Sequence, residues 1–502
     1  MLAKALTYAI DGVQARRVTV EVDIRSGLPA FSVVGLPDTA VRESRERVRA
    51  ALLNEGFEYQ QRRITVNLAP ADLHKAGPAF DLAIAAAVLS ASGQIDSASI
   101  EGVALVGELS LDGGVRGVRG ALAIAESARS DDLSALVVAA GNAREASLVE
   151  GLEVIATERL SDLLRLAQLG AQETTSVSEE APSEHGPDLA DLRGHKFTLR
   201  ALEIAAAGGH NLLLNGPPGC GKTMLARRLP SILPPMSPQE ALDVTRLQSI
   251  AGDLRIDGLA RSRPFRAPHH TISASGLIGG GRLPTPGEVT LATHGVLFLD
   301  ELAEFSTRTL EALRQPLEDG RVTVSRGQRT HVYPARFALV AATNPCPCGH
   351  GGARCRCTPL ETARYARRLT GPLLDRFDIH CAVERPSVAE VEAGPVTDST
   401  TVRERVQASR ERQEVRLSDQ GIHCNAQMNS AQTRRLVAPT EPVRRMLIES
   451  YRSGMLSLRG YDRALRVSRT IADLDGRESV DQDDMAEALA FRVGESFTTE
   501  AV

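Results

Sequence analysis

The sequence predicts an α/β protein with a central parallel sheet, a separate α/β region before it and a helical region after it. Three short apolar runs predict the central strands, at residues 211–214, 296–299 and 337–342. A polar or glycine-rich segment follows each run. Short apolar runs between turn signals are typical of strands that helices cover on both faces. Strands that alternate with helices form parallel sheets, whose ligand sites lie at the carboxyl ends of the strands.

Length and composition bound the class of protein. A chain of 502 residues exceeds one ordinary core, so we expect two or three domains. Its 42% apolar and 24% charged residues are typical of globular proteins. No apolar stretch is long enough for a membrane span, and Asp11 interrupts the apolar N-terminus before it resembles a signal peptide. We therefore expect a cytoplasmic protein with no membrane partner.

A polar, acidic segment at residues 171–187 predicts a flexible linker, because it holds too little apolar surface to offset the cost of ordering. Before it, Val18, Val20, Val22 and Ile24 alternate as in a half-buried strand. The further elements expected there are a helix at 44–55, a strand at 64–68 and a buried helix at 83–89. The expected organisation is an α/β domain at 1–170, the linker at 171–187, a core domain around the central sheet at 188–386 and a helical lid at 387–502.

Charge and aromatic content restrict how this chain could hold nucleic acid. The formal net charge is −5, so any contact with DNA must come from local basic patches and not from a uniformly basic surface. Aromatic residues make up 3% of the chain and tryptophan is absent, which disfavours binding by base stacking. A nucleic-acid contact would therefore grip the phosphate backbone.

A glycine-rich turn directly after the first central strand matches the phosphate-loop pattern G-x-x-x-x-G-K-[ST]. Glycines let backbone N–H groups turn toward phosphates, and the helix that follows adds the positive end of its dipole. Lys222 would reach the β- and γ-phosphates of ATP, and the Thr223 hydroxyl would ligate Mg²⁺. The expected nucleotide-binding residues are Gly216, Pro217, Pro218, Gly219, Cys220, Gly221, Lys222 and Thr223.

Two further strands end in polar residues that suit the same site. The second strand delivers Asp300, which would bind the magnesium, and Glu301, which would polarise the attacking water. The third strand ends at Asn344, which suits a water-positioning or phosphate-sensing role. A plain turn before Pro345 is the alternative for Asn344. Arg376 lies among apolar and acidic neighbours, and a local ion pair with Asp375 or Asp378 is the simplest interpretation from the residues.

Four of the seven cysteines form two C-x-C pairs, Cys346/Cys348 and Cys355/Cys357, six residues apart. Alternate residues of an extended segment face the same way, so each pair can present two thiolates. Four thiolates suit a closed tetrahedral zinc site, in which His350 could replace one ligand. Free thiols and disulfides are the alternatives that the spacing leaves open. A zinc ion here would be structural and not catalytic.

Several runs in the second part of the chain resemble magnesium-chelatase-like AAA+ ATPases. They are residues 265–270 (FRAPHH), 286–289 (PGEV) and 295–301 (GVLFLDE). With the first 170 residues included, the chain resembles the YifB/ComM family over essentially its whole length. The resemblance implies an AAA+ P-loop core followed by a C-terminal helical lid. ComM-type members are hexameric helicases that promote branch migration in natural transformation, so it also implies a homo-hexamer acting on DNA with recombination proteins.

The resemblance assigns further residues. It implies that Arg376 is an arginine finger that reaches the ATP of a neighbouring subunit, and that Arg459 is the second sensor arginine, with Arg463 a weaker candidate. Residues 320–334 resemble the pore hairpin that precedes the first sensor. Arg326 and Arg329 at its tip are the expected contacts with the DNA backbone, and a solvated turn is the alternative.

The N-terminal region resembles a Lon-protease-like domain of the ribosomal-S5-domain-2 type. Residues 75–80 match the segment that carries the nucleophile of Lon proteases, but Ala79 occupies the position of the serine. Leu122 occupies the position of the catalytic lysine. A Ser–Lys dyad needs both a hydroxyl and an amine that deprotonates it. The sequence therefore predicts a non-proteolytic domain and excludes an ATP-dependent protease.

A DNA motor with the activity of a helicase is the function we expect. The alternative from another class is a metal-chelatase motor, which drives metal insertion through partner subunits. The N-terminal domain favours the DNA motor, because chelatase motor subunits are expected to lack it.

Overall fold

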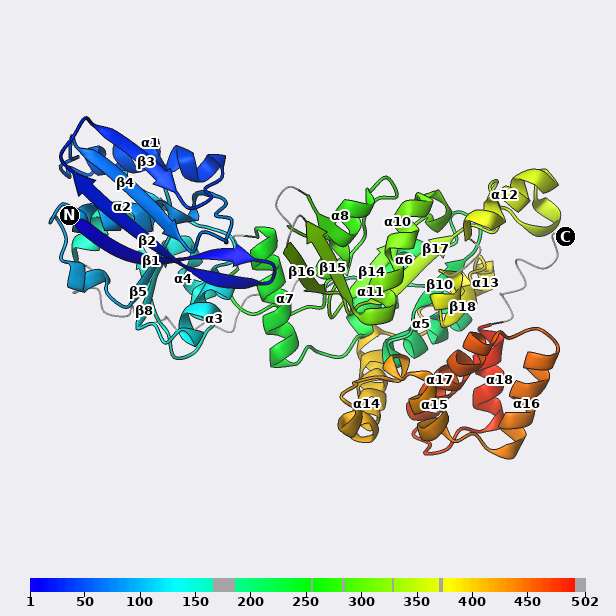
Figure 1. The fold of residues 1–502 in the computed structure, drawn as a ribbon. Coiled ribbons are helices and arrows are strands. Elements are labelled where there is room, and N and C mark those ends of the chain that lie inside the picture. The colour runs from blue at the N-terminus through cyan, green and yellow to red at the C-terminus, as the bar shows by residue number, and fades with distance from the viewer. Residues whose placement is uncertain (166–185, 254–255, 282–284, 327–328, 370–372, 493–502) are drawn as a thin grey trace.

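The computed structural model describes residues 1–165, 186–253, 256–281, 285–326, 329–369 and 373–492. Figure 1 shows three parts in chain order: an N-terminal unit of strands and helices, a central unit around a second sheet, and a helical unit beneath the central one. Most of the expected linker, residues 171–185, lies outside the described residues. Within the described ranges, no helix is both long enough and apolar enough to cross a membrane.

The N-terminal unit is built on a mixed seven-stranded sheet with the order β3-β4-β2-β1-β5-β8-β9. β2 forms where expected, because Val18, Val20, Val22 and Ile24 alternate into the core and are all buried. The expected helices and the strand at 64–68 are confirmed as α1, α2 and β4. The elements are β1 (Leu2–Asp11), β2 (Gln14–Arg25), β3 (Ala30–Val34), α1 (Thr39–Asn54), β4 (Arg63–Ala69), α2 (Asp81–Ala91), β5 (Val103–Val106), β6 (Glu108–Leu109), β7 (Val115–Arg116), α3 (Ala121–Ser130), β8 (Ala135–Ala139), α4 (Ala140–Ala146) and β9 (Glu153–Thr157).

The central unit holds a five-stranded sheet with the order β11-β14-β17-β10-β18, and every neighbouring pair is parallel. The three expected strands are confirmed as β10, β14 and β17. Because the strands run in one direction, their carboxyl ends share one edge of the sheet. The elements of the sheet and its adjoining helices are α5 (Lys196–Gly208), β10 (Leu212–Asn215), α6 (Lys222–Ile232), β11 (Phe265–Arg266), β14 (Val296–Leu299), β17 (Ala338–Thr343) and β18 (Ile379–Ala382).

Inserted segments extend this central unit. α7 begins after Ser237, whose side chain caps the helix together with Glu240, and ends at Gly252 in the left-handed region. β15 and β16 form the expected hairpin, an antiparallel pair whose register ends at Arg326 opposite Arg329. The inserted elements are α7 (Pro238–Ala251), α8 (Ala274–Ile278), β12 (Gly279–Gly280), β13 (Thr285–Pro286), α9 (Glu288–Leu291), α10 (Thr307–Ala312), α11 (Arg314–Asp319), β15 (Arg321–Arg326) and β16 (Arg329–Pro334).

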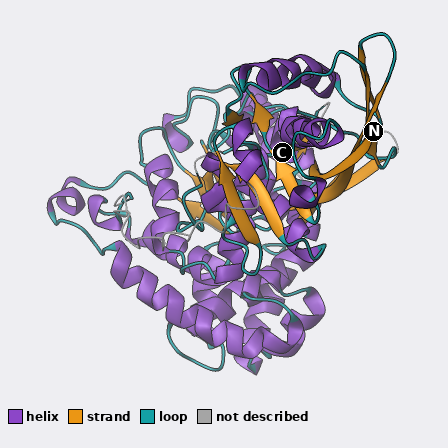
Figure 2. Ribbon diagram, turned by 90° about the vertical axis from the view of Figure 1, so that its left-hand side faces the viewer, coloured by secondary structure: helices purple, strands orange, loops and turns teal. Residues whose placement is uncertain are grey.

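From α14 (Ser399–Leu417) onward the chain is helical, as expected; these helices lie below the central sheet in Figure 1, and helices fill the lower part of Figure 2. α14 and α17 both pack against α5 and α17 also packs against α18, so the helical unit shares a core with the central sheet. The helices are α12 (Pro359–Leu369), α13 (Val388–Glu392), α14 (Ser399–Leu417), α15 (Ser430–Val437), α16 (Glu441–Arg452), α17 (Leu458–Leu474) and α18 (Gln482–Ala490).

The N-terminal unit contacts the central unit through α3 and the turn between β1 and β2. The backbone N–H of Gly120 donates to the carbonyl of Ser249 on α7 at 3.2 Å, and Glu126 forms an ion pair with Arg246 on the same helix at 3.2 Å. Asp11 lies 3.5 Å from His331 of the hairpin strand β16. The N-terminal unit is therefore linked both to α7 and to the hairpin.

Candidate functional site

The phosphate-loop motif connects β10 to α6 at the carboxyl edge of the central sheet. Gly219 and Gly221 have φ angles of 73° and 89°, which other residues rarely adopt. A Cβ atom on Gly216 would lie 2.2 Å from the carbonyl oxygen of Val383, so this position also requires glycine. These glycines let the loop turn sharply into the amino terminus of α6, where an anionic group is stabilised.

Lys222 is buried within this loop, and its ammonium group lies among three oxygen acceptors. It donates to the carbonyl of Gly216 at 2.6 Å, to that of Pro217 at 3.0 Å and to Oδ1 of Asn344 at 3.1 Å. Asn344 therefore belongs to the same site, and its side chain does more than begin a turn. The ammonium group is held where a phosphate cradled by the loop would meet it.

Thr223 and Asp300 form the second pair of the site. The Thr223 hydroxyl donates to Oδ2 of Asp300 at 2.7 Å, although the residues come from α6 and from the end of β14. Oδ1 of Asp300 accepts from the backbone N–H of Glu301 at 3.0 Å. A hydroxyl and a carboxylate in contact beside a phosphate loop form a ligand pair suited to Mg²⁺ bound with nucleotide phosphates.

Glu301 follows Asp300 directly and has an unusual backbone conformation. Its φ of 53° lies in the left-handed region, an uncommon state for a residue with a Cβ atom that is often found at functional sites. Its carboxylate is largely exposed, and Oε2 lies 3.6 Å from Nδ1 of His270. The His270 ring contacts that of His269 in a tilted arrangement, with centroids 4.1 Å apart. Sequence reasoning did not single out His270, because nothing in the spacing links it to Glu301.

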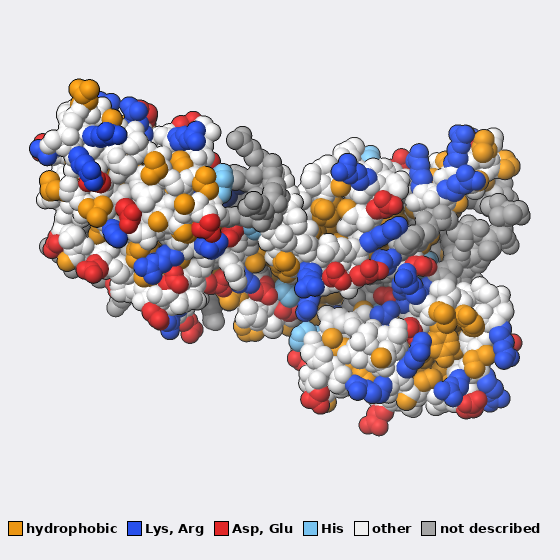
Figure 3. Space-filling model, viewed as in Figure 1, with side chains coloured by type: hydrophobic (Ala, Val, Ile, Leu, Met, Phe, Trp, Pro, Cys, Tyr) orange, Lys and Arg blue, Asp and Glu red, His pale blue; other side chains and the backbone are white. Residues whose placement is uncertain are grey.

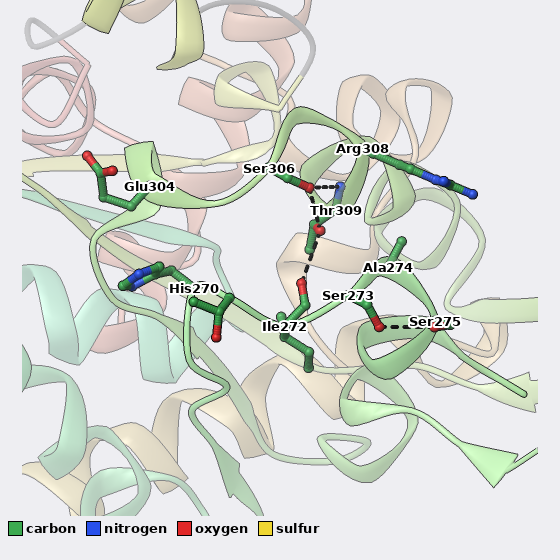
Figure 4. A pocket seen from close by; sticks show the side chains of 10 residues that line it. His270, Ile272, Ser273, Ala274, Ser275, Glu304, Ser306, Arg308 and Thr309 are labelled. Atoms are coloured by element: carbon green, nitrogen blue, oxygen red, sulfur yellow. Dashed lines mark hydrogen bonds between the residues drawn. The ribbon is translucent and has the colours of Figure 1, made fainter.

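A surface cavity of 570 Å³ lies beside this pair. Figure 4 shows His270 and Glu304 on one side and a chain of hydrogen bonds through Ser306 and Thr309 to the backbone of Ile272 across the middle. The Thr309 hydroxyl donates to the carbonyl of Ile272 at 3.3 Å. The segment after β14 is thereby connected to the segment after β11, which carries His270.

Three further residues approach the phosphate loop from other elements, and sequence reasoning missed them. Arg385, beyond the end of β18, donates to the carbonyl of Pro218 at 3.0 Å. His195, whose φ is 60°, lies against Gly221. The Tyr365 hydroxyl donates to the carbonyl of Asn344 at 3.0 Å. No motif marks these positions, since each reaches the loop only through the fold.

Arg376 and Arg459 lie away from the phosphate loop. Arg376 immediately precedes β18, so it lies at the amino edge of the sheet, opposite the phosphate loop. Its guanidinium forms an ion pair with Glu318 of α11, and not with Asp375 or Asp378 as a purely local interpretation expects. Arg459 is exposed at the start of α17, with Nη1 3.8 Å from Oδ2 of Asp375. The two arginines therefore lie near each other and away from the nucleotide motif of their own chain.

Arg463, the weaker sensor candidate, belongs to a buried charge cluster. Nε of Arg463 and Nη2 of Arg466 lie 3.4 and 3.5 Å from Oδ1 of Asp378, and His210 lies 3.5 Å from Oδ2. Burial alone would raise the pKa of Asp378, but Arg466, His210 and Arg463 outweigh it and lower the pKa below its usual range. This ionised carboxylate ties α17 to the start of β18, which is a structural role for Arg463.

The four clustered cysteines lie together after Asn344. Their sulfur atoms all lie within 4.8 Å of one another, and none is in a disulfide. The separations are 3.3 Å for Cys346 and Cys348, 3.6 Å for Cys346 and Cys355, and 3.9 Å for Cys348 and Cys355. N–H groups, that of Arg356 foremost, donate to the sulfur of Cys348 and lower its pKa to about 5. Burial, together with the neighbouring thiols, raises the pKa of Cys357 to about 12, so of these two thiols only Cys348 favours the thiolate form that metals bind.

The hairpin places Arg326 and Arg329 opposite each other at the ends of β15 and β16. Their side chains lie outside what the structure describes, so the proposed contact with DNA stays a prediction. At the base of the hairpin, Val322 and Tyr333 are buried. The base of the hairpin therefore packs against the rest of the protein.

In the N-terminal unit, the positions expected to lack catalytic groups are packed. Leu122 is fully buried in α3, and Ala79 lies partly buried in the short turn before α2. Lys75, which precedes Ala79, is also fully buried and donates to the carbonyl of Pro70. Positions 79 and 122 therefore hold small or apolar side chains that contribute to packing, and neither is a serine or a lysine.

Three family models match consecutive parts of the chain. Residues 188–391 match "Magnesium chelatase, subunit ChlI", and residues 396–492 match the C-terminal model of the same subunit. Residues 20–142 match "Subunit ChlI of Mg-chelatase". Since this last match covers the N-terminal unit, that unit does not by itself distinguish the chain from chelatase subunits.

The chain is similar to characterised and uncharacterised bacterial proteins over nearly its full length. It is 43% identical to the uncharacterised protein YifB of Escherichia coli over 491 residues, 97% of this chain and 96% of YifB. It is 44% identical to the competence protein ComM of Haemophilus influenzae over 504 residues, 98% of this chain and 97% of ComM. A partial match at 27% identity covers 36% of this chain and 37% of Lon protease 2 of Bacillus subtilis.

Proposed function

The chain belongs to the YifB/ComM family of magnesium-chelatase-like proteins, and on this premise we propose that it is an AAA+ motor that hydrolyses ATP to ADP and phosphate. The observation that carries the proposal is the meeting of two pairs at one edge of the central sheet. Lys222 contacts Asn344, and Thr223 contacts Asp300. Phosphoryl transfer requires mainly such positioning and charge neutralisation.

Each residue of the site has a distinct role in this proposal. Lys222 binds the β- and γ-phosphates, and Thr223 and Asp300 hold Mg²⁺, which would neutralise the charge that develops on the phosphates. Glu301, the next residue after Asp300, polarises the attacking water. Asn344 orients the same water or senses the γ-phosphate through the amide that contacts Lys222.

The proposed ATP site is completed by a neighbouring subunit. Arg376 and Arg459 lie at the amino edge of the sheet, whereas the phosphate loop lies at the carboxyl edge. In a head-to-tail ring, one face of each subunit meets a different face of the next, so groups at opposite edges of the sheet can meet across one interface. We therefore assign both arginines to the ATP of the adjacent subunit in a homo-hexamer. The ion pair with Glu318 would hold Arg376 in place between turnovers.

DNA is the proposed substrate of the motor. One similar protein carries the name competence protein, which supports a role in natural transformation or recombination. On the face in Figure 3, basic and acidic side chains are interspersed, which favours a local contact over a broad basic surface. We assign that contact to Arg326 and Arg329 on the hairpin. The motor would act as a cytoplasmic helicase or branch-migration factor on single-stranded or branched DNA, together with recombination proteins.

The alternative function is a metal-chelatase-type motor that drives metal insertion through partner proteins. The three matches to magnesium chelatase subunit models support it. Both functions use the same ATP site, so they differ only in what the hairpin contacts.

We further propose that Cys346, Cys348, Cys355 and Cys357 hold one structural zinc ion. A tetrahedral zinc site with bonds of about 2.3 Å separates its sulfur atoms by about 3.8 Å. The separations among the sulfur atoms of Cys346, Cys348 and Cys355 are 3.3, 3.6 and 3.9 Å, on either side of that value. His350 is exposed and is not needed as a ligand when four sulfur atoms are present.

The deciding experiment measures ATPase activity and DNA binding with forked, four-way and single-stranded DNA. The Arg326→Ala/Arg329→Ala variant should lose DNA stimulation and DNA affinity while basal ATPase and ring assembly persist. Loss of two phosphate contacts should make the salt dependence of binding shallower by roughly one to two in log–log slope. The matched control is Arg321→Ala/Arg336→Ala, which removes two exposed arginines at the base of the hairpin. Wild-type protein that hydrolyses ATP but binds no DNA would favour the chelatase-type motor.

A further inference from the structure

The cysteine cluster lies in a segment that starts and ends at the nucleotide site. It begins directly after Asn344, whose side chain contacts Lys222. It continues through the four cysteines into α12, and Tyr365 of that helix returns to the starting point. The Tyr365 hydroxyl lies 3.0 Å from the carbonyl oxygen of Asn344 and 3.1 Å from the Thr343 hydroxyl. The segment therefore leaves the end of β17 at Asn344 and returns to it at Tyr365.

The middle of this loop lies against the phosphate loop. A Cβ atom on Gly349 would come within 2.7 Å of Cδ of Pro218, so the backbone at Gly349 contacts Pro218 directly. Gly349 has a φ of 80° and is buried. The cysteine segment thus touches both halves of the site: the loop that would cradle phosphates and the strand end that carries Asn344.

Apolar burial holds little of this segment in place. None of the residues of α12, all within the described part of the chain, is buried. In the cysteine loop, Cys346 and Gly349 are buried, whereas Pro347, His350 and Arg356 are exposed. A segment without a core of its own needs a cross-link or a metal to stay ordered.

The four sulfur atoms of the cysteine cluster are placed to bind such a metal ion. Backbone N–H groups donate to them: Gly351 to Cys346 at 3.3 Å, Arg356 to Cys348 at 3.4 Å, and Cys348 to Cys357 at 3.2 Å. Hydrogen bonds of this kind orient the ligands of a metal and stabilise their charge. A zinc ion at the cluster would fix the backbone at 346–357 and, through it, the position of Gly349 and the start of α12.

We propose that a zinc ion at this cluster stabilises the nucleotide site. The zinc ion positions Pro218 through Gly349 and Asn344 through Tyr365, so that zinc occupancy sets the efficiency of ATP hydrolysis. The inference rests on the proposed ATPase function and adds a regulatory dependence to it. Gly349 and Tyr365 are positioning residues, since they act on the nucleotide through Pro218 and Asn344.

The first test measures zinc and nucleotide binding in the full chain. Wild-type protein purified without chelator should hold about one zinc per chain, and Cys355→Ser/Cys357→Ser should lose it. The control Cys424→Ser, at a buried thiol outside the cluster, should keep it. Removal of zinc with a chelator should weaken ATP binding reversibly, and zinc addition should restore it. Wild-type protein without metal and with four freely titratable thiols in the cluster, or ATP binding that zinc removal leaves unchanged, would overturn the proposal.

The second test leaves the zinc ligands intact and disturbs only the contact between Gly349 and Pro218. Gly349→Ala should keep zinc but lower kcat/KM for ATP by about ten- to a hundredfold, because a small misplacement of a reactive site has effects of this size. The matched control is Gly352→Ala in the same loop. Its φ of 48° is also left-handed, but an added Cβ meets nothing within 4 Å. It should keep zinc and stay within about twofold of wild type, since it leaves the contact with Pro218 intact.

Tyr365→Phe should retain zinc and lower kcat about two- to tenfold, the usual effect of one lost hydrogen bond. Zinc-loaded Gly349→Ala with wild-type kcat/KM would refute the proposed role of the zinc ion in the nucleotide site. Equal losses of kcat/KM in Gly349→Ala and Gly352→Ala would refute it as well. A wild-type protein that holds zinc but neither binds nor hydrolyses ATP would refute the proposed ATPase function itself. Zinc content and nucleotide binding, measured separately, distinguish these failures.

Discussion

The two sheets of this protein differ in what lies at their strand ends. The central sheet is parallel throughout, and the ends of β10, β14 and β17 bring Lys222, Asp300 and Asn344 to one edge. The N-terminal sheet is mixed, with an antiparallel β1–β2 hairpin at its centre. Its two expected catalytic positions carry Ala79 and Leu122, which pack among other side chains.

This difference shows how a buried position is either maintained for chemistry or given over to packing. Lys222 is buried, yet three oxygen atoms accept from its ammonium group, so its charge is compensated. Leu122 is equally buried and needs no partner. A charge is stable in such a position only where the fold supplies acceptors, and the central sheet supplies them at its carboxyl edge.

The largest effect should come from Arg376, which tests whether the polar edge of the central sheet is completed by a neighbour. Arg376→Ala should lower kcat by about 10³- to 10⁵-fold, the usual contribution of an arginine finger. Mixing it with Lys222→Ala chains should restore part of the ATPase activity, because about a quarter of the interfaces in mixed rings then have both groups intact. No recovery at any ratio, despite co-assembly shown by mass analysis, would contradict a shared site.

Glu301→Gln should lower kcat by about 10²- to 10⁴-fold while ATP still binds, since only water activation is lost. Lys222→Ala should instead weaken binding of the nucleotide. Measurement of ATP affinity and single-turnover hydrolysis separates the two variants. Normal hydrolysis in Glu301→Gln would show that another residue polarises the water.

In the N-terminal unit the largest effect should be on stability and not on catalysis. Leu122→Ala should lower the free energy of unfolding by about 2–5 kcal/mol, because it leaves a cavity in a packed region. ATPase activity at low temperature should persist. The control Leu111→Ala removes an exposed leucine and should change stability little. Denaturant unfolding monitored by circular dichroism measures both variants, and equal stabilities would contradict the packing role.

A smaller effect is expected from His270, which contacts Glu301 at the carboxyl edge of the central sheet. His270→Ala should raise basal ATPase about two- to fivefold, because it frees the Glu301 carboxylate from its contact with the imidazole ring. His269→Ala is the matched control, since His269 bonds to Thr271 and does not reach Glu301. A steady-state assay without DNA checks this, and a fall in rate would mean that His270 assists hydrolysis.

The smallest effect should come from restoring a hydroxyl to the N-terminal unit. Ala79→Ser should leave ATPase unchanged and produce no peptidase activity, because Leu122 supplies no amine to deprotonate the serine. Cleavage of an unfolded protein substrate by this variant would show that another base, such as the buried Lys75, can serve.

Contiguous motifs account for what could be predicted about the site. The phosphate loop occupies eight successive residues after an apolar strand, and Asp300 and Glu301 follow another strand directly. Local spacing also predicts the cysteine cluster, three strands of the central sheet and two of the N-terminal sheet, whereas the hairpin follows from the family resemblance. His270, Arg385 and Tyr365 escaped prediction because they act on residues far from them in sequence.

The sequence by itself determined the phosphate loop, the acidic pair and the cluster of four cysteines, because each depends on neighbouring residues and their types. The replacement of a protease dyad by Ala79 and Leu122 follows instead from the resemblance to Lon proteases. Only the tertiary structure decided which of these groups meet. Thr223 and Asp300 are 77 residues apart, and Lys222 and Asn344 are 122 apart. Parallel strands bring them to one edge and leave Arg376 at the other. Strand direction and order determine that separation, because they follow from packing of the whole sheet and not from any local pattern.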